Sequence, residues 1–132
     1  MTATTLILMT LGHLTGDYIL QSHWMATEKT KRWTPALVHA SVYTACYLPA
    51  TQSPVALAVI GGTHALIDRY RLARHLVWAK NHLGPCRTWH PWVDCTATGY
   101  PPDVPAWLAV WLMIACDNTI HLTINASSVV WL

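Results

Sequence analysis

The segment Pro54-Val-Ala-Leu-Ala-Val-Ile-Gly-Gly-Thr-His64-Ala-Leu-Ile-Asp68 places a histidine and an aspartate four residues apart at the end of an apolar run. On a helix this spacing puts both side chains on one face. Burying a charge is costly unless the charge is paired or holds a metal ion. The segment therefore predicts a helix that presents a paired imidazole and carboxylate in an apolar environment.

Two other apolar segments repeat this arrangement, with the pairs His13/Asp17 and Asp117/His121, and a fourth contains His39. The three pairs use half of the six carboxylates of a chain in which only 11% of the residues are charged. So many ionisable groups in apolar segments are typical of a shared site. We therefore predict an all-α, membrane-embedded bundle of about four helices, built around a metal centre.

The overall composition agrees with a single helical membrane domain over residues 1–132. The chain has 132 residues, enough for one core, and 53% of them are hydrophobic. Its mean hydropathy of +0.29 is higher than that of a typical soluble domain. The net charge of +2 is small and dispersed, which argues against a nucleic-acid partner. The lipid bilayer is the partner that we expect, and the oligomeric state stays open.

Four helices are expected, at about residues 2–21, 35–48, 54–80 and 106–131, with a long irregular loop before the last. Thr34 and Pro35 suit the first positions of the second helix. That helix is short for a hydrocarbon core of roughly 30 Å, so whether it crosses fully stays open. Gly61 and Gly62 would allow another helix to approach the third one closely. A soluble or peripheral bundle is the alternative.

The positions of the charged residues predict how the chain is oriented in the membrane. Met1 to Leu20 has no basic start and contains His13 and Asp17, so it is expected to be a retained helix rather than a secretory signal. Lys29, Lys31 and Arg32 lie in the first connection, and the other Lys and Arg residues all lie between Arg69 and Arg87. The positive-inside rule then predicts a multi-pass protein of the bacterial inner membrane with both basic loops in the cytoplasm.

The candidate ligands outnumber what one tetrahedral ion can use. They bring nitrogen and oxygen donors together, which favours zinc, with manganese or iron as alternatives. The number of donors would suit one or two ions. Gln21 and Asn125 continue two of the polar stripes at the same four-residue step and could orient the ligands. The predicted metal ligands are His13, Asp17, His39, His64, Asp68, Asp117 and His121.

The other histidines and the cysteines are expected to have ordinary roles. His23, His75, His82 and His90 are expected to be solvated. A second metal site formed by His82, Cys86, His90 and Cys95 was weighed, but the spacing matches no known zinc pattern, and an ordinary loop is preferred.

A metal ion lowers the pKa of bound water to about 7, so the predicted function is a metal-dependent hydrolase. Asp17, Asp68 and Asp117 would be its catalytic carboxylates, as ligands, as a bridge or as a general base. A position near the cytoplasmic interface would suit a lipid-derived or membrane-attached substrate. The alternatives are a non-catalytic protein with a structural metal, a proton pathway, buried ion pairs that fix helix packing, and a role in contacting host proteins.

Several strings resemble the family DUF3307, which comprises small bacterial and phage membrane proteins of unknown function. They are His13-Leu-Thr-Gly-Asp17-Tyr-Ile-Leu-Gln21, Trp24-Met-Ala-Thr-Glu-Lys29, Leu37-Val-His39, Thr63-His64-Ala-Leu-Ile-Asp68-Arg69 and Asp117-Asn118-Thr-Ile-His121. The resemblance implies that the His and Asp positions, with Gln21, are the family's motif positions, and it implies no activity. Asn118, beside Asp117, is placed with the amides that orient ligands.

Overall fold

The computed structural model describes residues 2–86 and 89–132, and its regular structure in this part of the chain is entirely helical. The predicted all-α class is therefore confirmed. Met1 and Arg87, which bounded two of the segments named above, lie outside the described residues. The described chain forms two compact units, one of residues 1–70 with 121–132 and one of residues 71–120. Each is described by itself, and the single domain stays a prediction.

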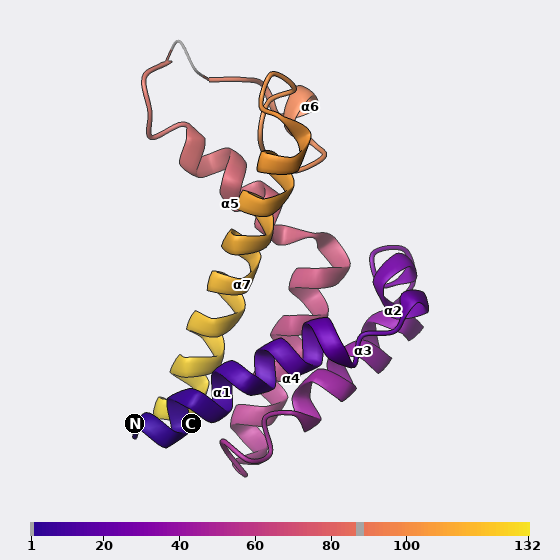
Figure 1. Ribbon diagram of the computed structural model, residues 1–132, viewed down its shortest axis with the longest axis vertical. Helices are drawn as coiled ribbons and strands as arrows, with labels where there is room; N and C mark the ends of the chain where they lie inside the picture. The colour runs from indigo at the N-terminus through magenta and orange to yellow at the C-terminus, as the bar shows by residue number, and fades with distance from the viewer. Residues whose placement is uncertain (1, 87–88) are drawn as a thin grey trace. The chain divides into compact units, whose positions relative to one another are not determined.

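The first unit contains most of the predicted polar pairs. Its helices are α1 (Ala3–Leu14), the π-helical turn η1 (Thr15–Ile19), α2 (His23–Glu28), α3 (Trp33–Ala45), α4 (Pro54–Tyr70) and the end of α7 (Ala106–Trp131). α3 packs against α4, and η1 packs against α3 (Figure 1). The core of this unit is formed by Met9, Tyr43, Tyr47 and Ile60.

Two helix starts differ from the sequence prediction. The polar stretch at 22–34, expected to be a connection, contains α2, because the Ser22 side chain accepts a hydrogen bond from the Met25 backbone N–H and caps a helical turn. α3 begins at Trp33 rather than at Pro35, and Arg32 at its N-cap makes no side-chain capping bond. The predicted role of Thr34 as the cap is therefore wrong.

The continuous helix expected over residues 54–80 is also wrong, because the chain breaks at Arg71. This residue has φ of 52° and ψ of 49°, the left-handed region that few non-glycine residues adopt. The second unit begins there with α5 (Leu72–Asn81). The Arg71 guanidinium donates to the Ala97 carbonyl and that of Arg74 to the Thr96 carbonyl, both at 2.8 Å. These bonds join residues more than 20 positions apart, so the local periodicity of the sequence cannot predict them.

The predicted irregular loop before the last helix is confirmed, with one short helix inside it, α6 (Trp92–Cys95). Gly99 has φ of 85°, and a Cβ there would meet the backbone of α5 at Arg74. The Trp78 indole N–H donates to the His90 carbonyl at 3.0 Å. The loop is thus held against α5 by backbone contacts and aromatic side chains.

Close approach of the helices in the first unit depends on glycines, among them Gly16 and Gly61. A Cβ on Gly16 would lie 2.7 Å from Cδ2 and 3.1 Å from Cα of Tyr43, so η1 and α3 can meet only because this residue is glycine. A Cβ on Gly61 would lie 2.5 Å from the Thr44 hydroxyl oxygen, which confirms the close approach predicted there. The same prediction for Gly62 is wrong, because nothing lies within 4 Å of a Cβ at that position.

By length and composition, α7 is the one helix among the described residues that could cross a membrane. Its most apolar 18-residue window has a mean hydropathy of 1.3. α3 has 13 residues and a length of about 20 Å, short of the roughly 30 Å hydrocarbon core. The predicted four-span bundle therefore reduces to an all-helical protein with one candidate span.

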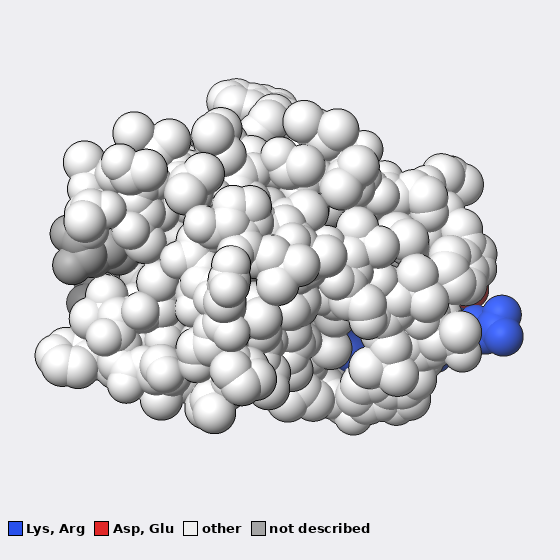
Figure 2. All heavy atoms as spheres, turned by 90° about the horizontal axis from the view of Figure 1, so that it is seen from below, with Lys and Arg blue, Asp and Glu red and all other residues white. Residues whose placement is uncertain are grey.

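The surface of the first unit is nevertheless rich in exposed apolar side chains. On α1 and η1, Ile7 is 59% exposed, Leu11 54% and Ile19 72%. Figure 2 shows one face on which nearly all visible atoms belong to uncharged residues, with Lys and Arg atoms toward one side. Apolar surface of this extent is typical of a membrane or protein contact.

Candidate metal centre

Four side chains from three helical segments converge inside the first unit. Asp17 comes from η1, His39 from α3, and His64 and Asp68 from α4. Each offers one ligand atom, and the four atoms lie within 4.8 Å of one another. We call these four residues the His/Asp group. The group could hold a metal ion.

The distances that involve the two imidazole nitrogens of the group are nearly equal. Asp17 Oδ1 lies 3.2 Å from His39 Nε2 and 3.4 Å from His64 Nε2. Asp68 Oδ2 lies 3.3 Å and 3.2 Å from the same two nitrogens, which are 3.0 Å apart. Bonds of roughly 2.0–2.1 Å place the ligand atoms of a tetrahedral ion about 3.3 Å apart. The separations that involve the two imidazole nitrogens are thus close to those that a tetrahedral ion requires.

Hydrogen bonding alone accounts poorly for this packing. Asp17 Oδ1 is buried and accepts no well-formed hydrogen bond from the described residues, although two imidazole nitrogens lie within 3.4 Å of it. The side chain of His39 is fully buried, and that of Asp68 is 7% exposed. A buried polar atom without a partner needs an explanation, and a bound ion is one such explanation.

The backbone at Asp17 departs from a regular helix. The Leu20 N–H donates to the Thr15 carbonyl at 2.9 Å, the five-residue step of a π-helix. π-helical turns are rare and often occur at functional sites, since the additional residue changes the directions of the neighbouring side chains. Here the turn carries Asp17 into the His/Asp group, while Gly16 allows α3 to approach.

A second layer of buried polar groups supports Asp17 through its other oxygen. His13 Nδ1 lies 3.4 Å from Asp17 Oδ2 and 2.8 Å from the Tyr43 hydroxyl. The Asn125 amide of α7 donates to the hydroxyls of Tyr43 and Tyr47, each at 2.6 Å. The Tyr43 ring also stacks on His64, with ring centroids 3.7 Å apart. These contacts fix the orientation of two members of the group.

His121 contacts the group from α7. Its Nε2 lies 3.5 Å from Asp68 Oδ1, and its Nδ1 lies 3.3 Å from His64 Nδ1. His121 therefore lies beside the Oδ1 oxygen of Asp68, whereas the His/Asp group contains the Oδ2 oxygen. In this position Asp68 could bridge between His121 and the His/Asp group.

Of the remaining predicted site residues, Gln21 lies shortly after η1 and the others lie on α7. Asp117 is half-buried on α7, one turn before His121, and Asn118 follows it. The Gln21 amide donates to the backbone carbonyl of Asp17 at 3.1 Å, so it braces the π-helical turn rather than a carboxylate. Asn125 orients tyrosines rather than a predicted ligand. The catalytic assignments to Asp17, Asp68 and Asp117 stay predictions.

Lys29 is a further member of the site, which its sequence context does not indicate. Its Nζ lies 2.6 Å from Asp68 Oδ2 and 3.3 Å from His39 Nε2, and its side chain is only 16% exposed. Lys31, two residues on, is 64% exposed and pairs with Glu28 at 2.8 Å, which lowers the pKa of the Glu28 carboxyl. Nothing local distinguishes these two lysines. The sequence prediction also lacks Tyr43 and Tyr47, although they follow His39 at the four-residue step of one helical face.

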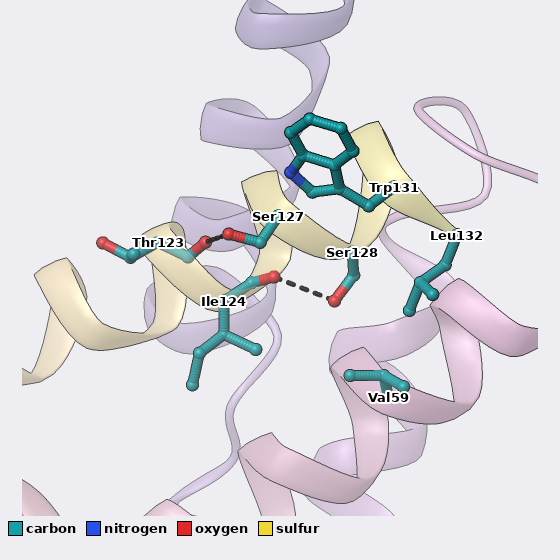
Figure 3. A pocket seen from close by; sticks show the side chains of 7 residues that line it. All are labelled: Val59, Thr123, Ile124, Ser127, Ser128, Trp131 and Leu132. Carbon is teal, nitrogen blue, oxygen red and sulfur yellow. Dashed lines mark hydrogen bonds between the residues drawn. The ribbon is translucent and has the colours of Figure 1, made fainter.

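A separate pocket of about 360 Å³ lies between α4 and the last turns of α7 (Figure 3). Val59, Ile124 and Trp131 line it together with two serines. The hydroxyls of Ser127 and Ser128 donate to the carbonyls of Thr123 and Ile124 on their own helix, so they are already bonded. None of its lining residues is His, Asp or Glu, and the pocket offers no metal-binding chemistry.

Comparison with known proteins agrees with the resemblance found in the sequence. A model of the family DUF3307, described as a protein of unknown function, matches residues 5–84. Because this is more than half of the chain, the protein belongs to that family. All four residues of the His/Asp group lie inside the match, as does Lys29, whereas Asp117 and His121 lie beyond it. No curated protein and no solved structure matches the chain.

Proposed function

We propose that this protein is a membrane-associated, metal-dependent hydrolase whose ion is held by the His/Asp group. The observation that supports the proposal most strongly is the convergence of four buried side chains, Asp17, His39, His64 and Asp68, whose carboxylate oxygens lie 3.2–3.4 Å from two imidazole nitrogens that are 3.0 Å apart. Two imidazoles with two carboxylates favour zinc, with manganese or iron as alternatives. Whether one or two ions bind depends on Asp68, which faces the group with one oxygen and His121 with the other.

An ion in this group would supply a Lewis acid that makes water acidic enough to act as a nucleophile at neutral pH. The residues around it would fix the geometry. His13 holds the second oxygen of Asp17, and Tyr43 stacks on His64. Asp68, within 3.3 Å of both imidazole nitrogens, is suitably placed as a ligand or as the base that takes a proton from water.

The proposed location is the bilayer, with a lipid-derived or membrane-attached substrate. The support comes from α7, which is long and apolar enough to cross, and from the exposed apolar residues of α1 and η1. In the multi-pass arrangement that we propose, both basic connections face the cytoplasm and the protein resides in the bacterial inner membrane. Lys29 and the His/Asp group would then lie near the cytoplasmic interface.

A structural metal site is the second candidate function. Four protein side chains can close a tetrahedral site, as in structural zinc centres, whereas a catalytic centre keeps one position open. The same four donor atoms thus support both candidates. They differ in whether water or an added anion reaches the ion.

Elemental analysis of the detergent-purified protein tests the proposal. We expect one or two equivalents of zinc, manganese or iron in the wild type, and loss of the metal in the double variant His64→Ala, Asp68→Ala. The matched control is His75→Ala, Asp94→Ala in the second unit, which should keep the metal. Wild-type protein that contains no stoichiometric metal, although it was never exposed to a chelator, would contradict the proposal.

If metal is present, hydrolysis of phosphoester, ester and amide substrates by the same preparations separates the two candidates. A hydrolase loses activity in Asp68→Ala while its helical content is retained. A structural site instead yields a variant that unfolds and a wild type without hydrolytic activity.

A further inference from the structure

Lys29 places an ammonium group against two of the four ligand atoms of the His/Asp group. The distances are 2.6 Å to Asp68 Oδ2 and 3.3 Å to His39 Nε2. With 16% exposure for the lysine and 7% for the aspartate, this is a largely buried pair. A lysine side chain is seldom so buried without a partner. Its position is therefore set by the site.

The backbone near Lys29 is held in place by the residue next to Asp68. The Arg69 guanidinium donates to the carbonyl of Thr30 and, at 3.0 Å, to that of Lys31. It also lies over the Trp33 ring, with its central carbon 5.7 Å from the ring centroid. Asp68 thus binds the side chain of Lys29, and Arg69 binds the backbone of the two residues that follow it.

The contact with His39 conflicts with metal binding. The nitrogen of an imidazole that accepts a hydrogen bond has one lone pair, and a metal ion uses that same lone pair. His39 Nε2 can therefore face Lys29 or an ion, but not both. Asp68 Oδ2 has a second lone pair, so it can accept a hydrogen bond from Lys29 and still bind an ion.

We propose that Lys29 is a tethered cation that occupies the His/Asp group until a metal ion displaces it. The inference rests on the proposed metal centre and adds a determinant of its affinity. In the metal-free protein the ammonium offsets the charge of the buried carboxylates. Binding of the ion releases Lys29 from His39, so the affinity of the site is lower than its four ligands alone would give.

Amine labelling with and without Zn²⁺ tests the displacement directly. Acetylation of Lys29 at constant pH, followed by peptide mass spectrometry, should become at least about tenfold faster when zinc is bound, because the amine leaves a buried pair. Lys31 is an internal control, since its exposed pair with Glu28 lies outside the group. A protein that binds zinc while Lys29 is labelled as slowly as before contradicts the inference but leaves the metal centre intact.

Affinity measurements provide the second arm. Lys29→Met should bind Zn²⁺ at least about tenfold more tightly than the wild type, whereas Lys29→Arg, which keeps the cation, should stay weak. Lys31→Met should match the wild type. If Lys29→Met does not fold without metal, Lys29→Gln, which keeps a polar group, takes its place. Unchanged or weaker binding in the neutral variant overturns the inference.

The two failures can be told apart. Absence of zinc from both the wild type and Lys29→Met removes the proposed function and this inference together. Zinc bound by Lys29→Met but not by the wild type contradicts both, because no ion then displaces the lysine in the natural chain.

Discussion

The two units contain the same kinds of side chain but use them differently. In the first unit, His39 and His64 are buried, and their Nε2 atoms lie 3.0 Å apart among carboxylates. In the second unit, His75 stacks on Trp92 with centroids 4.3 Å apart, and His82 Nδ1–H donates to the Trp78 backbone carbonyl at 2.8 Å. Within the described residues of that unit, no three His, Cys, Asp or Glu side chains come together as a ligand set. Convergence of buried residues, rather than residue type, makes the site.

The largest expected effect is the loss of a central ligand. His39→Ala removes the nitrogen that lies within 3.3 Å of every other member of the group, and zinc affinity should fall by more than about 100-fold, beyond the range seen for supporting residues. Isothermal titration of the metal-free protein with Zn²⁺ measures this affinity. Added imidazole should restore part of the binding. The control His82→Ala should bind zinc as tightly as the wild type. An equal loss of zinc affinity in this variant would contradict the assignment of the metal site to the first unit.

A smaller effect is expected from the contact that brings η1 to α3. Gly16→Ala forces a methyl group against the Tyr43 backbone and ring, and overpacking of this kind costs about 1–3 kcal/mol of unfolding free energy. Denaturant unfolding followed by circular dichroism gives the value. Gly62→Ala, on α4 with open space around it, should be neutral or stabilising. Equal stability of the two variants would show that Gly16 does not position Asp17.

The smallest effect concerns the tyrosine that supports the group. Tyr43→Phe keeps the ring that stacks on His64 but removes the hydroxyl bonded to His13, so zinc affinity should fall by about 10-fold. The comparison variant is Tyr100→Phe in the second unit, where the hydroxyl accepts from Lys80. We expect zinc titration of this variant to match the wild type. If Tyr43→Phe binds zinc as tightly as the wild type, the Tyr43 hydroxyl does not contribute to zinc affinity, which then depends on the four ligands alone.

Local spacing predicted several features of the site correctly. His64 and Asp68 share a face of α4, as the four-residue step required, and their side chains lie 3.2 Å apart. His13 and Asp17 also meet, at 3.4 Å, even though the helix changes to a π-helical turn between them. The selection of His39 for its apolar surroundings also proved useful, because it lies in the centre of the group.

Other features could not be predicted from spacing. The end of α4 at Tyr70 depends on bonds from Arg71 and Arg74 to residues 97 and 96, and an amphipathic pattern runs through the break unchanged. Lys29 and Lys31 look alike in the sequence, yet one reaches Asp68, 39 positions away, and the other reaches a neighbour. Spacing also does not tell which of the seven predicted ligands supply the four donor atoms of the His/Asp group, and the other assignments stay predictions.

The sequence by itself determined the helical class, the family and the polar faces of the helices, because 3.6 residues per turn translate spacing directly into direction. The tertiary structure alone decided which polar faces meet. Gly16 and Gly61 set how closely the helices approach, and Arg69 fixes the connection that carries Lys29. Such contacts join residues far apart in the chain, and their energies depend on the packing of whole helices, which no local pattern contains.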